Sequence, residues 1–128
     1  MSDGLRQFQT KDEPLIEFPG GAKRSDRRGK GRFDLISPIF LRRLAGVYER
    51  GAEQKGDNNW LGGFPISRCL DSAMRHINQY REGDRSEDHL AQAAWQLACA
   101  VTFEEKYADD TTINDLPDYR PIRGASGM

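Results

Sequence analysis

The stretch LAQAAWQLACAVTF, residues 90 to 103, decides the fold class of this chain. Only Gln92, Gln96 and Thr102 interrupt its apolar residues, so a helix built from it has no polar face. Such a helix must be covered on all sides and therefore lies at the centre of a protein. The stretch predicts an all-α fold organised around this third helix.

The residues on either side of this stretch predict where the helix begins and ends. Ser86 opens it, and Glu87 and Asp88 fall in its first turn, where acidic side chains suit the positive end of the helix dipole. After Tyr107 the sequence becomes polar and rich in turn-forming residues. We therefore divide the chain into a basic N-terminal arm or ordered loop (1–36), a helical core (37–107) and a polar tail (108–128).

Two amphipathic helices are predicted before the central one. The first begins with Ser37 as N-cap and Pro38 at the first helical position, and Gly56 ends it. The second begins near Ser67 and ends at Gly83. The first helix has an apolar stripe with a period of 3.6 residues, formed by Phe40, Leu41, Leu44, Ala45, Tyr48 and Ala52. The apolar face of the second comprises Ile66, Cys69, Leu70, Ala73, Met74, Ile77 and Tyr80.

The helices are too few to cover the central one. Three helices over about 70 residues bury little apolar surface, and small cores are marginally stable. We therefore expect a homodimer or homotetramer in which neighbouring subunits complete a helix bundle. Bundles of this kind also hold metal ions between inward-facing carboxylates.

Composition restricts the possible classes. A net charge of −1 gives no global argument for nucleic-acid binding, although a basic run extends from Lys23 to Arg32. No apolar stretch approaches the roughly 18 residues of a membrane span, and the N-terminus lacks the apolar region of a signal peptide. Cys69 and Cys99 lie on predicted buried faces without metal-ligand spacing. We expect them to be reduced core thiols of a cytoplasmic protein.

Acidic residues stand out in VYERGAEQKGDNNW, residues 47 to 60. Glu49 and Glu53 lie one helical turn apart on one flank of the first helix. Packing of this helix against a neighbour would bring them towards Glu87 and Asp88, and carboxylate clusters suit Mg²⁺ or Mn²⁺. For each acid alone, a solvated or salt-bridged role stays open.

Other residues fit a nucleotide. Trp60, behind Asn58 and Asn59, is suited to stacking on a base, or alternatively to capping the bundle. Arginine and lysine are natural partners of phosphate. The alternatives are a disordered arm for the basic run and a surface salt bridge between Asp71 and Arg75. Each of the two histidines is either a base or metal ligand or a packing residue. The substrate contacts expected from these arguments are Lys30, Arg32, Asn59, Trp60, Arg75 and His76.

Four segments together resemble the phage dATP/dGTP diphosphohydrolases, relatives of the MazG-like all-α nucleoside triphosphate pyrophosphatases. They are GAKRSDRRGKGRFDLISP, VYERGAEQKGDNNW, SRCLDSAMRHINQY and SEDHLAQAAW, and they cover roughly residues 22 to 105. The family pattern Y-x-x-G-A-x-K-x-G-x-x-N-W is met, with the lysine displaced by one position, by Tyr48, Gly51, Ala52, Lys55, Gly56, Asn59 and Trp60. The patterns R-H and E-x-H-L-A are met by Arg75, His76, Glu87, His89, Leu90 and Ala91.

The resemblance implies a MazG-like fold and hydrolysis of dGTP, and of dATP, to a monophosphate and pyrophosphate. It also implies two or three Mg²⁺ or Mn²⁺ ions and a supply of dGMP for 2-aminoadenine nucleotides in a phage. On this basis Lys55 joins the expected substrate contacts, and Glu53 would position or deprotonate the attacking water. The expected metal ligands are Glu49, Glu53, Glu87 and Asp88.

The chain departs from the wider group's E-x-x-E and E-x-x-D patterns, because Glu49 and Glu53 are four positions apart and Leu90 stands three residues after Glu87. Two other functions stay open. One is a non-enzymatic helical phage adaptor that binds nucleic acid or a protein through its basic arm. The other is a hydrolase that removes the whole triphosphate.

Overall fold

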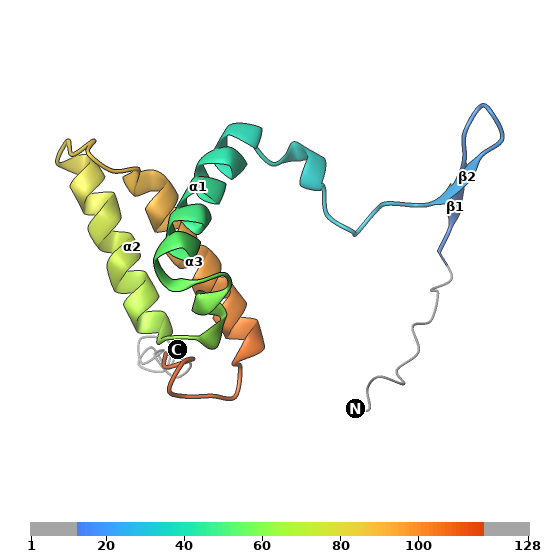
Figure 1. The fold of residues 1–128 in the computed structure, drawn as a ribbon. Helices are drawn as coiled ribbons and strands as arrows, with labels where there is room; N and C mark the ends of the chain where they lie inside the picture. Colours follow the sequence, from blue (N-terminus) through green and yellow to red (C-terminus); the bar gives the residue numbers. More distant parts are fainter. Residues whose placement is uncertain (1–12, 117–128) are drawn as a thin grey trace, which may run out of the picture. The chain divides into compact units, whose positions relative to one another are not determined.

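The computed structural model describes residues 13–116, which form two compact units that divide between Leu35 and Ile36. The N-terminal unit contains a two-stranded antiparallel hairpin, in which β1 (Leu15–Glu17) pairs with β2 (Lys23–Ser25), and a short 3₁₀ helix, η2 (Phe33–Leu35) (Figure 1). The sequence suggested an arm or loop here and did not predict the strands. Three-residue strands with both faces exposed carry no alternation of apolar and polar residues to reveal them.

The second unit contains the α-helices of the described residues and confirms the all-α fold class. They are α1 (Pro38–Lys55), α2 (Ile66–Arg81) and α3 (His89–Lys106), with a short 3₁₀ helix, η3 (Asn59–Gly62), between the first two. Helix α3 packs extensively against α2 and less extensively against α1. It is therefore the central helix, as its apolar sequence predicted (Figure 1).

The predicted start and end of α1 are confirmed. Ser37 Oγ accepts a hydrogen bond from the backbone N–H of Phe40 (3.1 Å), and Pro38 occupies the first helical position. Gly56 follows the helix with a φ of 97°, and its N–H donates to the carbonyl oxygen of Ala52 (2.8 Å). The N-cap Ser37 and the terminating Gly56 therefore allowed both ends of α1 to be predicted from the sequence.

The predicted start of α3 was wrong by three residues. The helix begins at His89, because the Asp88 carboxylate is its N-cap and accepts from the N–H of Ala91 (3.2 Å). Ser86 does not cap the helix, since its N–H and its hydroxyl both donate to Asp84 Oδ1 (2.8 and 2.6 Å). The acidic residues read as a first turn therefore belong to a loop that precedes the helix.

A small core lies where α2 meets α3. Cys69, Cys99 and Phe103 have no exposed surface, which confirms that both cysteines are buried, and both are free thiols. Burial raises the pKa of the Cys99 thiol to about 12 and also raises the pKa of Cys69. Ile66 and Ala100 complete the buried cluster. Partly buried side chains that pack around it are Trp60, Phe64, Trp95, Tyr107, Ile113 and Leu116.

The segment after α3 returns to the start of α2 (Figure 1). Pro65 precedes α2 and offers no side-chain cap, so Asp115 supplies one from a distant part of the chain. Its carboxylate accepts from the N–H (3.0 Å) and the hydroxyl (2.5 Å) of Ser67. The Ile66 N–H also donates to the carbonyl oxygen of Ile113 (2.9 Å). Residues 108–116 of the expected tail are thus part of the fold, and residues 117–128 lie outside the described region.

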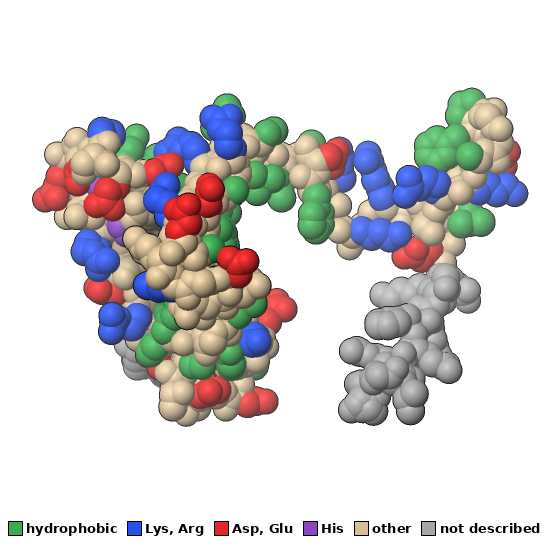
Figure 2. All heavy atoms as spheres, viewed as in Figure 1, with side chains coloured by type: hydrophobic (Ala, Val, Ile, Leu, Met, Phe, Trp, Pro, Cys, Tyr) green, Lys and Arg blue, Asp and Glu red, His purple; other side chains and the backbone are tan. Residues whose placement is uncertain are grey.

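Much of the predicted apolar surface is open in the single chain. On α2 only Ile66, Cys69 and Ala73 are buried, whereas Met74 is 63% exposed, so the described single chain covers only part of the predicted apolar face. Helix α1 has no buried residue, and hydrophobic side chains are visible along it in Figure 2. Completion of the bundle by other subunits stays a prediction. In residues 13–116, no helix has the length and apolar character to cross a membrane.

Candidate functional site

A pocket of about 460 Å³ opens between the end of α1, the loop that follows it and η3. We call it the aromatic pocket, because Tyr48, Trp60, Phe64 and Trp95 line it. Its remaining lining residues are Ala45, Glu49, Gly51, Ala52, Lys55, Gly56, Asp57, Asn58 and Asn59. Asn58 adopts a left-handed conformation (φ 60°), which asparagine tolerates, and it turns the chain from the α1 terminus into η3.

The aromatic rings form one connected cluster under this pocket. Trp60 makes edge-to-face contacts with Tyr48 (ring centroids 5.8 Å apart) and with Trp95 (6.5 Å), and Phe64 stacks on Trp95 (6.3 Å). Both functions left open for Trp60 are therefore compatible with its position, since it packs on the core and also lines the pocket. The indole N–H of Trp95 is buried without a hydrogen-bond partner among the described residues. It is an unsatisfied donor in a residue that lines the pocket.

A second cavity, of about 380 Å³, is more polar and shares Gly51, Lys55 and Trp95 with the aromatic pocket. We call it the polar cavity. Two cations, Arg50 and Lys55, reach it from α1. Its other lining residues are Val47, Gln54, His76, Glu87, Gln92 and Gln96.

His76, which lines this cavity, contacts the chain's other histidine. His76 Nδ1 on α2 lies 2.9 Å from His89 Nδ1 in the first turn of α3. One ligand atom from each of His76, Glu87 and His89 lies within 4.8 Å of the others. The Glu87 carboxylate accepts a hydrogen bond from Gln92 Nε2 (3.0 Å). His89 is almost completely buried, and the histidines show little surface in Figure 2.

The Asp84 carboxylate holds His89 from the opposite side of its ring. Asp84 Oδ2 lies 3.1 Å from His89 Nε2, and Oδ1 accepts two hydrogen bonds from Ser86. The bonds from Ser86, followed by the contact with His89, lower the pKa of Asp84 to about 2, so this carboxylate is ionised at neutral pH. Burial, and then the charges of His89 and Arg75, lower the pKa of His76. His76 is therefore a neutral imidazole near pH 7, which is the form that binds metals.

The four carboxylates predicted as metal ligands occupy different surroundings. Glu87 belongs to the histidine cluster, and Glu49 lines the aromatic pocket. Glu53 is exposed and lines neither cavity. Asp88 caps α3 and makes two hydrogen bonds with the guanidinium of Arg43 (2.8 and 2.5 Å). Within residues 13–116 of a single chain, Glu49, Glu53 and Asp88 join no group of three possible ligands, and their convergence stays a prediction.

The expected substrate contacts of the helical unit also lie in different places, some in the two cavities and one on the exposed surface of α2. Asn59 and Trp60 line the aromatic pocket, His76 lines the polar cavity, and Lys55 lines both. Arg75 is exposed on α2, with its guanidinium 3.7 Å from the Asp71 carboxylate. The surface salt bridge that was one reading of this pair is confirmed.

Lys30 and Arg32, the phosphate contacts favoured in the basic run, lie in the N-terminal unit. Lys30 Nζ is 3.0 Å from Glu13 Oε1. Arg32 makes two hydrogen bonds with the Asp34 carboxylate (2.9 and 2.8 Å). Both cations thus already have an acidic neighbour, which lessens their net attraction for a phosphate.

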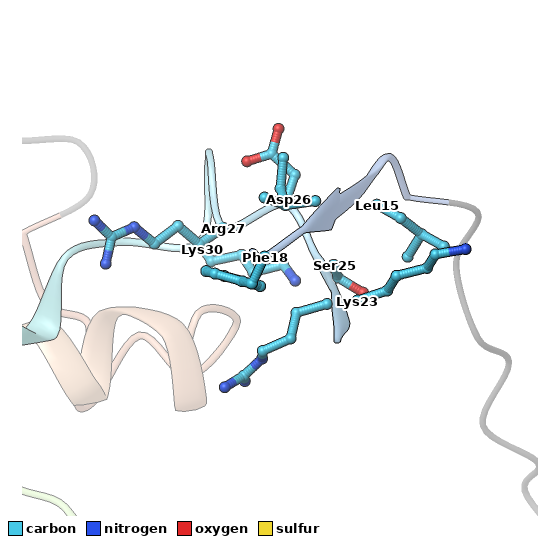
Figure 3. Close-up of a pocket in the computed structure, with 9 residues that line it drawn as sticks. Leu15, Phe18, Lys23, Ser25, Asp26, Arg27 and Lys30 are labelled. Atoms are coloured by element: carbon cyan, nitrogen blue, oxygen red, sulfur yellow. The ribbon is translucent and has the colours of Figure 1, made fainter. Parts of the chain in front are cut away.

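The hairpin also has a cavity of about 990 Å³, lined by Leu15, Ile16, Phe18, Lys23, Arg24, Ser25, Asp26, Arg27 and Lys30. Figure 3 shows the side chains of Lys23, Asp26 and Arg27 pointing in different directions instead of towards one point. Binding of a small ligand requires polar groups that converge on it. The helical unit is therefore the stronger candidate for the functional site.

Residues 20–113 match the family model described as "dATP/dGTP diphosphohydrolase, N-terminal". The chain belongs to this family. It is also 33% identical over 72 residues to a dATP/dGTP diphosphohydrolase of Salmonella phage PMBT28. That alignment covers 52% of this chain and 24% of the relative, so the chain spans about a quarter of the relative's length. No solved structure matches the chain.

Membership of this family confirms the resemblance seen in the sequence, and the family match includes both cavities and the histidine cluster. Sequence reasoning did not select Asp84, Arg50 or Trp95 as site residues, and it left the role of His89 open. A signal was present, because the chain has only two histidines and both fall within motifs of the resemblance. Their pairing depends on how α2 and α3 pack, which no motif encodes.

Proposed function

We propose that this protein acts in metal-dependent hydrolysis of a deoxypurine nucleoside triphosphate, dGTP and dATP, to the monophosphate and pyrophosphate. One observation carries the proposal: Lys55 lines both the aromatic pocket and the polar cavity. The polar cavity is also lined by Arg50, His76 and Glu87. An apolar, ring-lined compartment beside a cationic one matches the two halves of a nucleotide. The name of the family supplies the substrate class.

The purine would bind in the aromatic pocket. Trp60 and Tyr48 offer ring edges and faces to the base, and aromatic contacts of this kind contribute about 0.5–1.5 kcal/mol per pair beyond area burial. The amides of Asn58 and Asn59 have donors and acceptors that suit the edge of a purine. The unpaired indole N–H of Trp95 is a further donor at the same place.

The phosphates would then extend into the polar cavity. Arg50 and Lys55 would balance their negative charge, and an arginine fork binds phosphate oxygens in a bidentate manner. The donor set of His76, Glu87 and His89 fits a divalent ion, which would act as a Lewis acid and activate a water. Glu53 and Glu49 remain the proposed water-positioning and additional metal-binding carboxylates.

The proposed biological role is supply of dGMP for 2-aminoadenine nucleotides in a phage. The relative from Salmonella phage PMBT28 carries the name dATP/dGTP diphosphohydrolase, which supports the phage context of this proposal. We also propose a homodimer or homotetramer located in the cytoplasm of the host cell, in which neighbouring subunits cover the exposed apolar side chains of α1 and α2. Size-exclusion chromatography with light scattering tests the assembly directly.

Product analysis of the full chain tests the activity. Each of the eight common nucleoside and deoxynucleoside triphosphates is incubated with Mn²⁺, with Mg²⁺ and with a chelator. The expected result is metal-dependent release of pyrophosphate and monophosphate from dGTP and dATP. Nucleoside plus tripolyphosphate would identify removal of the whole triphosphate instead. No turnover, together with salt-sensitive nucleic-acid binding, would favour the adaptor.

Variants separate the proposed roles. Lys55→Met and Trp60→Ala are expected to raise KM, because they weaken phosphate and base binding. Glu53→Gln and Asp88→Asn test the carboxylate set, and full metal-dependent turnover in both would remove them from the mechanism. Glu104→Gln, an exposed change at the far end of α3, is the control.

A further inference from the structure

We infer that His76, Glu87 and His89 form a binding site for one divalent transition-metal ion, with Asp84 as the residue that positions His89. Neither the predicted carboxylate set nor the family name assigns this site. Its part in hydrolysis rests on the proposed function, but binding of the ion can be measured without a nucleotide. The site joins the C-terminal half of α2 to the first turn of α3.

The separation of the two histidine nitrogens fits adjacent ligands of one ion. Metal–nitrogen bonds are about 2.0–2.1 Å long. Two nitrogens 2.9 Å apart, as His76 Nδ1 and His89 Nδ1 are, would then subtend an angle of about 90° at the ion. This is the angle between neighbouring positions of an octahedron. The ring centroids are 5.2 Å apart, so the two Nδ1 atoms point at each other, and each imidazole must turn by about 45° for its lone pair to meet a shared ion.

Asp84 determines which nitrogen of His89 is available. A carboxylate oxygen accepts hydrogen bonds, so the Nε2 atom that contacts Asp84 Oδ2 carries a proton. In the neutral form of this ring the lone pair is then on Nδ1, the atom that faces His76. Metal-binding histidines usually donate their second N–H to a carboxylate in this manner, which fixes the tautomer and the ring orientation.

The tautomer of His76 follows from the same argument. Without an ion, His76 Nδ1 donates its proton to the lone pair of His89 Nδ1. On metal binding this proton leaves Nδ1, and a proton on Nε2 keeps the imidazole neutral.

Glu87 supplies the third ligand from the solvent side. It is exposed, and the hydrogen bond from Gln92 Nε2 occupies one carboxylate oxygen only. Three protein ligands leave further coordination positions for water or substrate. His76 and Glu87 both line the polar cavity, where Arg50 and Lys55 would attract phosphate oxygens towards those positions.

Two imidazoles and one carboxylate select the class of metal. Mg²⁺ and Ca²⁺ bind almost entirely through oxygen, whereas Mn²⁺, Fe²⁺, Co²⁺ and Zn²⁺ accept nitrogen ligands. We therefore expect Co²⁺ and Zn²⁺ to bind more tightly than Mn²⁺, and Mg²⁺ to bind more weakly than any of these.

Cobalt binding to the full chain, with no nucleotide present, tests the inference. Visible absorption of Co²⁺ and isothermal titration report the stoichiometry and the ligand field. We expect one Co²⁺ per chain at this site. Asp84→Asn should weaken binding by about 10–100-fold. His76→Phe and Glu87→Gln remove ligands and should weaken it further, whereas Glu104→Gln should bind as the unaltered chain does.

Circular dichroism spectra and melting curves verify that each variant is folded, and Glu87 is exposed enough that its replacement leaves the core intact. Equal Co²⁺ affinity in the unaltered chain, His76→Phe and Glu87→Gln would overturn the inference, as would no Co²⁺ binding at all. Intact binding without hydrolysis of any triphosphate would leave the site standing and refute the proposed function. Hydrolysis of dGTP that is unchanged in His76→Phe, while Co²⁺ binding is weakened, would refute the part of this site in hydrolysis and leave the site itself standing.

Discussion

Replacement of Gly63 by alanine should destabilise the helical unit more than any other glycine substitution near the site. Gly63 follows η3 with φ 92° and ψ 149°, and its N–H donates to the carbonyl oxygen of Trp60. An alanine Cβ would lie 2.7 Å from Cδ1 of Ile113 and 3.0 Å from Cε2 of Tyr107. Ordinary carbon–carbon contacts are about 3.5–4.0 Å. The change therefore combines a backbone conformation unsuited to alanine with a steric clash.

Gly56 provides a matched control. Its φ of 97° and ψ of 153° are nearly the same as those of Gly63, but a Cβ there would meet nothing within 4 Å. The backbone penalty, about 1–3 kcal/mol for this glycine-only region, is thus common to both variants. Effects on the unfolded chain are also common to both, because each change is glycine to alanine. The difference between the two variants isolates the clash.

The magnitude of the clash depends on which neighbours can move. Ile113 presents the end of a side chain and can rotate, but the Tyr107 ring is held by its hydroxyl, which donates to the carbonyl oxygen of Leu61 (2.7 Å). Overpacking in a well-packed region costs about 1–3 kcal/mol. We expect Gly63→Ala to lose about 1–2 kcal/mol more than Gly56→Ala, at the lower end of that range because one neighbour is mobile. Each kcal/mol corresponds to about 4–8 °C in Tm for a unit of this size.

Urea unfolding of the two variants, followed by tryptophan fluorescence and circular dichroism, measures this difference. Ile113→Val removes the atom at 2.7 Å, so it should be less harmful in the Gly63→Ala background than in the unaltered chain. Equal stability of Gly63→Ala and Gly56→Ala would refute the reasoning, because the close contacts of the added methyl group with Ile113 and Tyr107 would then carry no energy.

Three further predictions concern the ends of the helices and the core. Arg43 lowers the pKa of Asp88, so the stabilisation from this pair is present above the unfolded pKa of about 3.9 and is lost as the pH falls through the lower folded value. Asp88→Asn, which can still cap α3, should therefore cost up to about 1 kcal/mol at pH 7, and the cost should shrink as the pH falls below the unfolded pKa, in urea titrations at a series of pH values. Asp115→Ala removes the cap on Ser67 and should lower the stability by about 1 kcal/mol, measured as a lower Tm. The Cys99 thiol, with its pKa raised to about 12 and no exposed surface, should react with a thiol reagent only after denaturant is added.

The sequence predicted those parts of the fold that depend on local signals. Ser37 and Pro38 fixed the start of α1, Gly56 fixed its end, and the apolar run of α3 identified the central helix. The start of α3 was misplaced because Ser86 and Asp88 are both good caps. Only the structure shows that Asp84 engages the serine and leaves the cap to Asp88.

The apolar stripe of α2 shows a different limit. A period of 3.6 residues identifies the helix face but not how much of that face a neighbour covers. The buried positions Cys69 and Ala73 are small, which lets α3 approach closely on that side. Met74 and Ile77 belong to the same stripe and remain exposed, since nothing in the described single chain covers them. Periodicity therefore predicted the element correctly, and the described single chain covers only part of its apolar face.

The candidate site also has one part that local sequence predicted and one part that depends on how the helices pack. Lys55, Asn59 and Trp60 are close in sequence, and their shared pocket follows from the loop that connects α1 to η3. The histidine cluster instead needs two helices in register, because His76 and His89 are thirteen positions apart.

The loop between α2 and α3 sets that register. Gly83 reverses the chain with a φ of 98°, and the Asp84 N–H donates to the carbonyl oxygen of Gln79 (3.1 Å). The same Asp84 side chain then reaches His89. One residue thus ties the end of α2 to the ring that faces His76. An insertion after Gly83 would keep every motif residue and still separate the two rings, so the spacing of this loop, as much as the identity of the ligands, is what the proposed metal site requires.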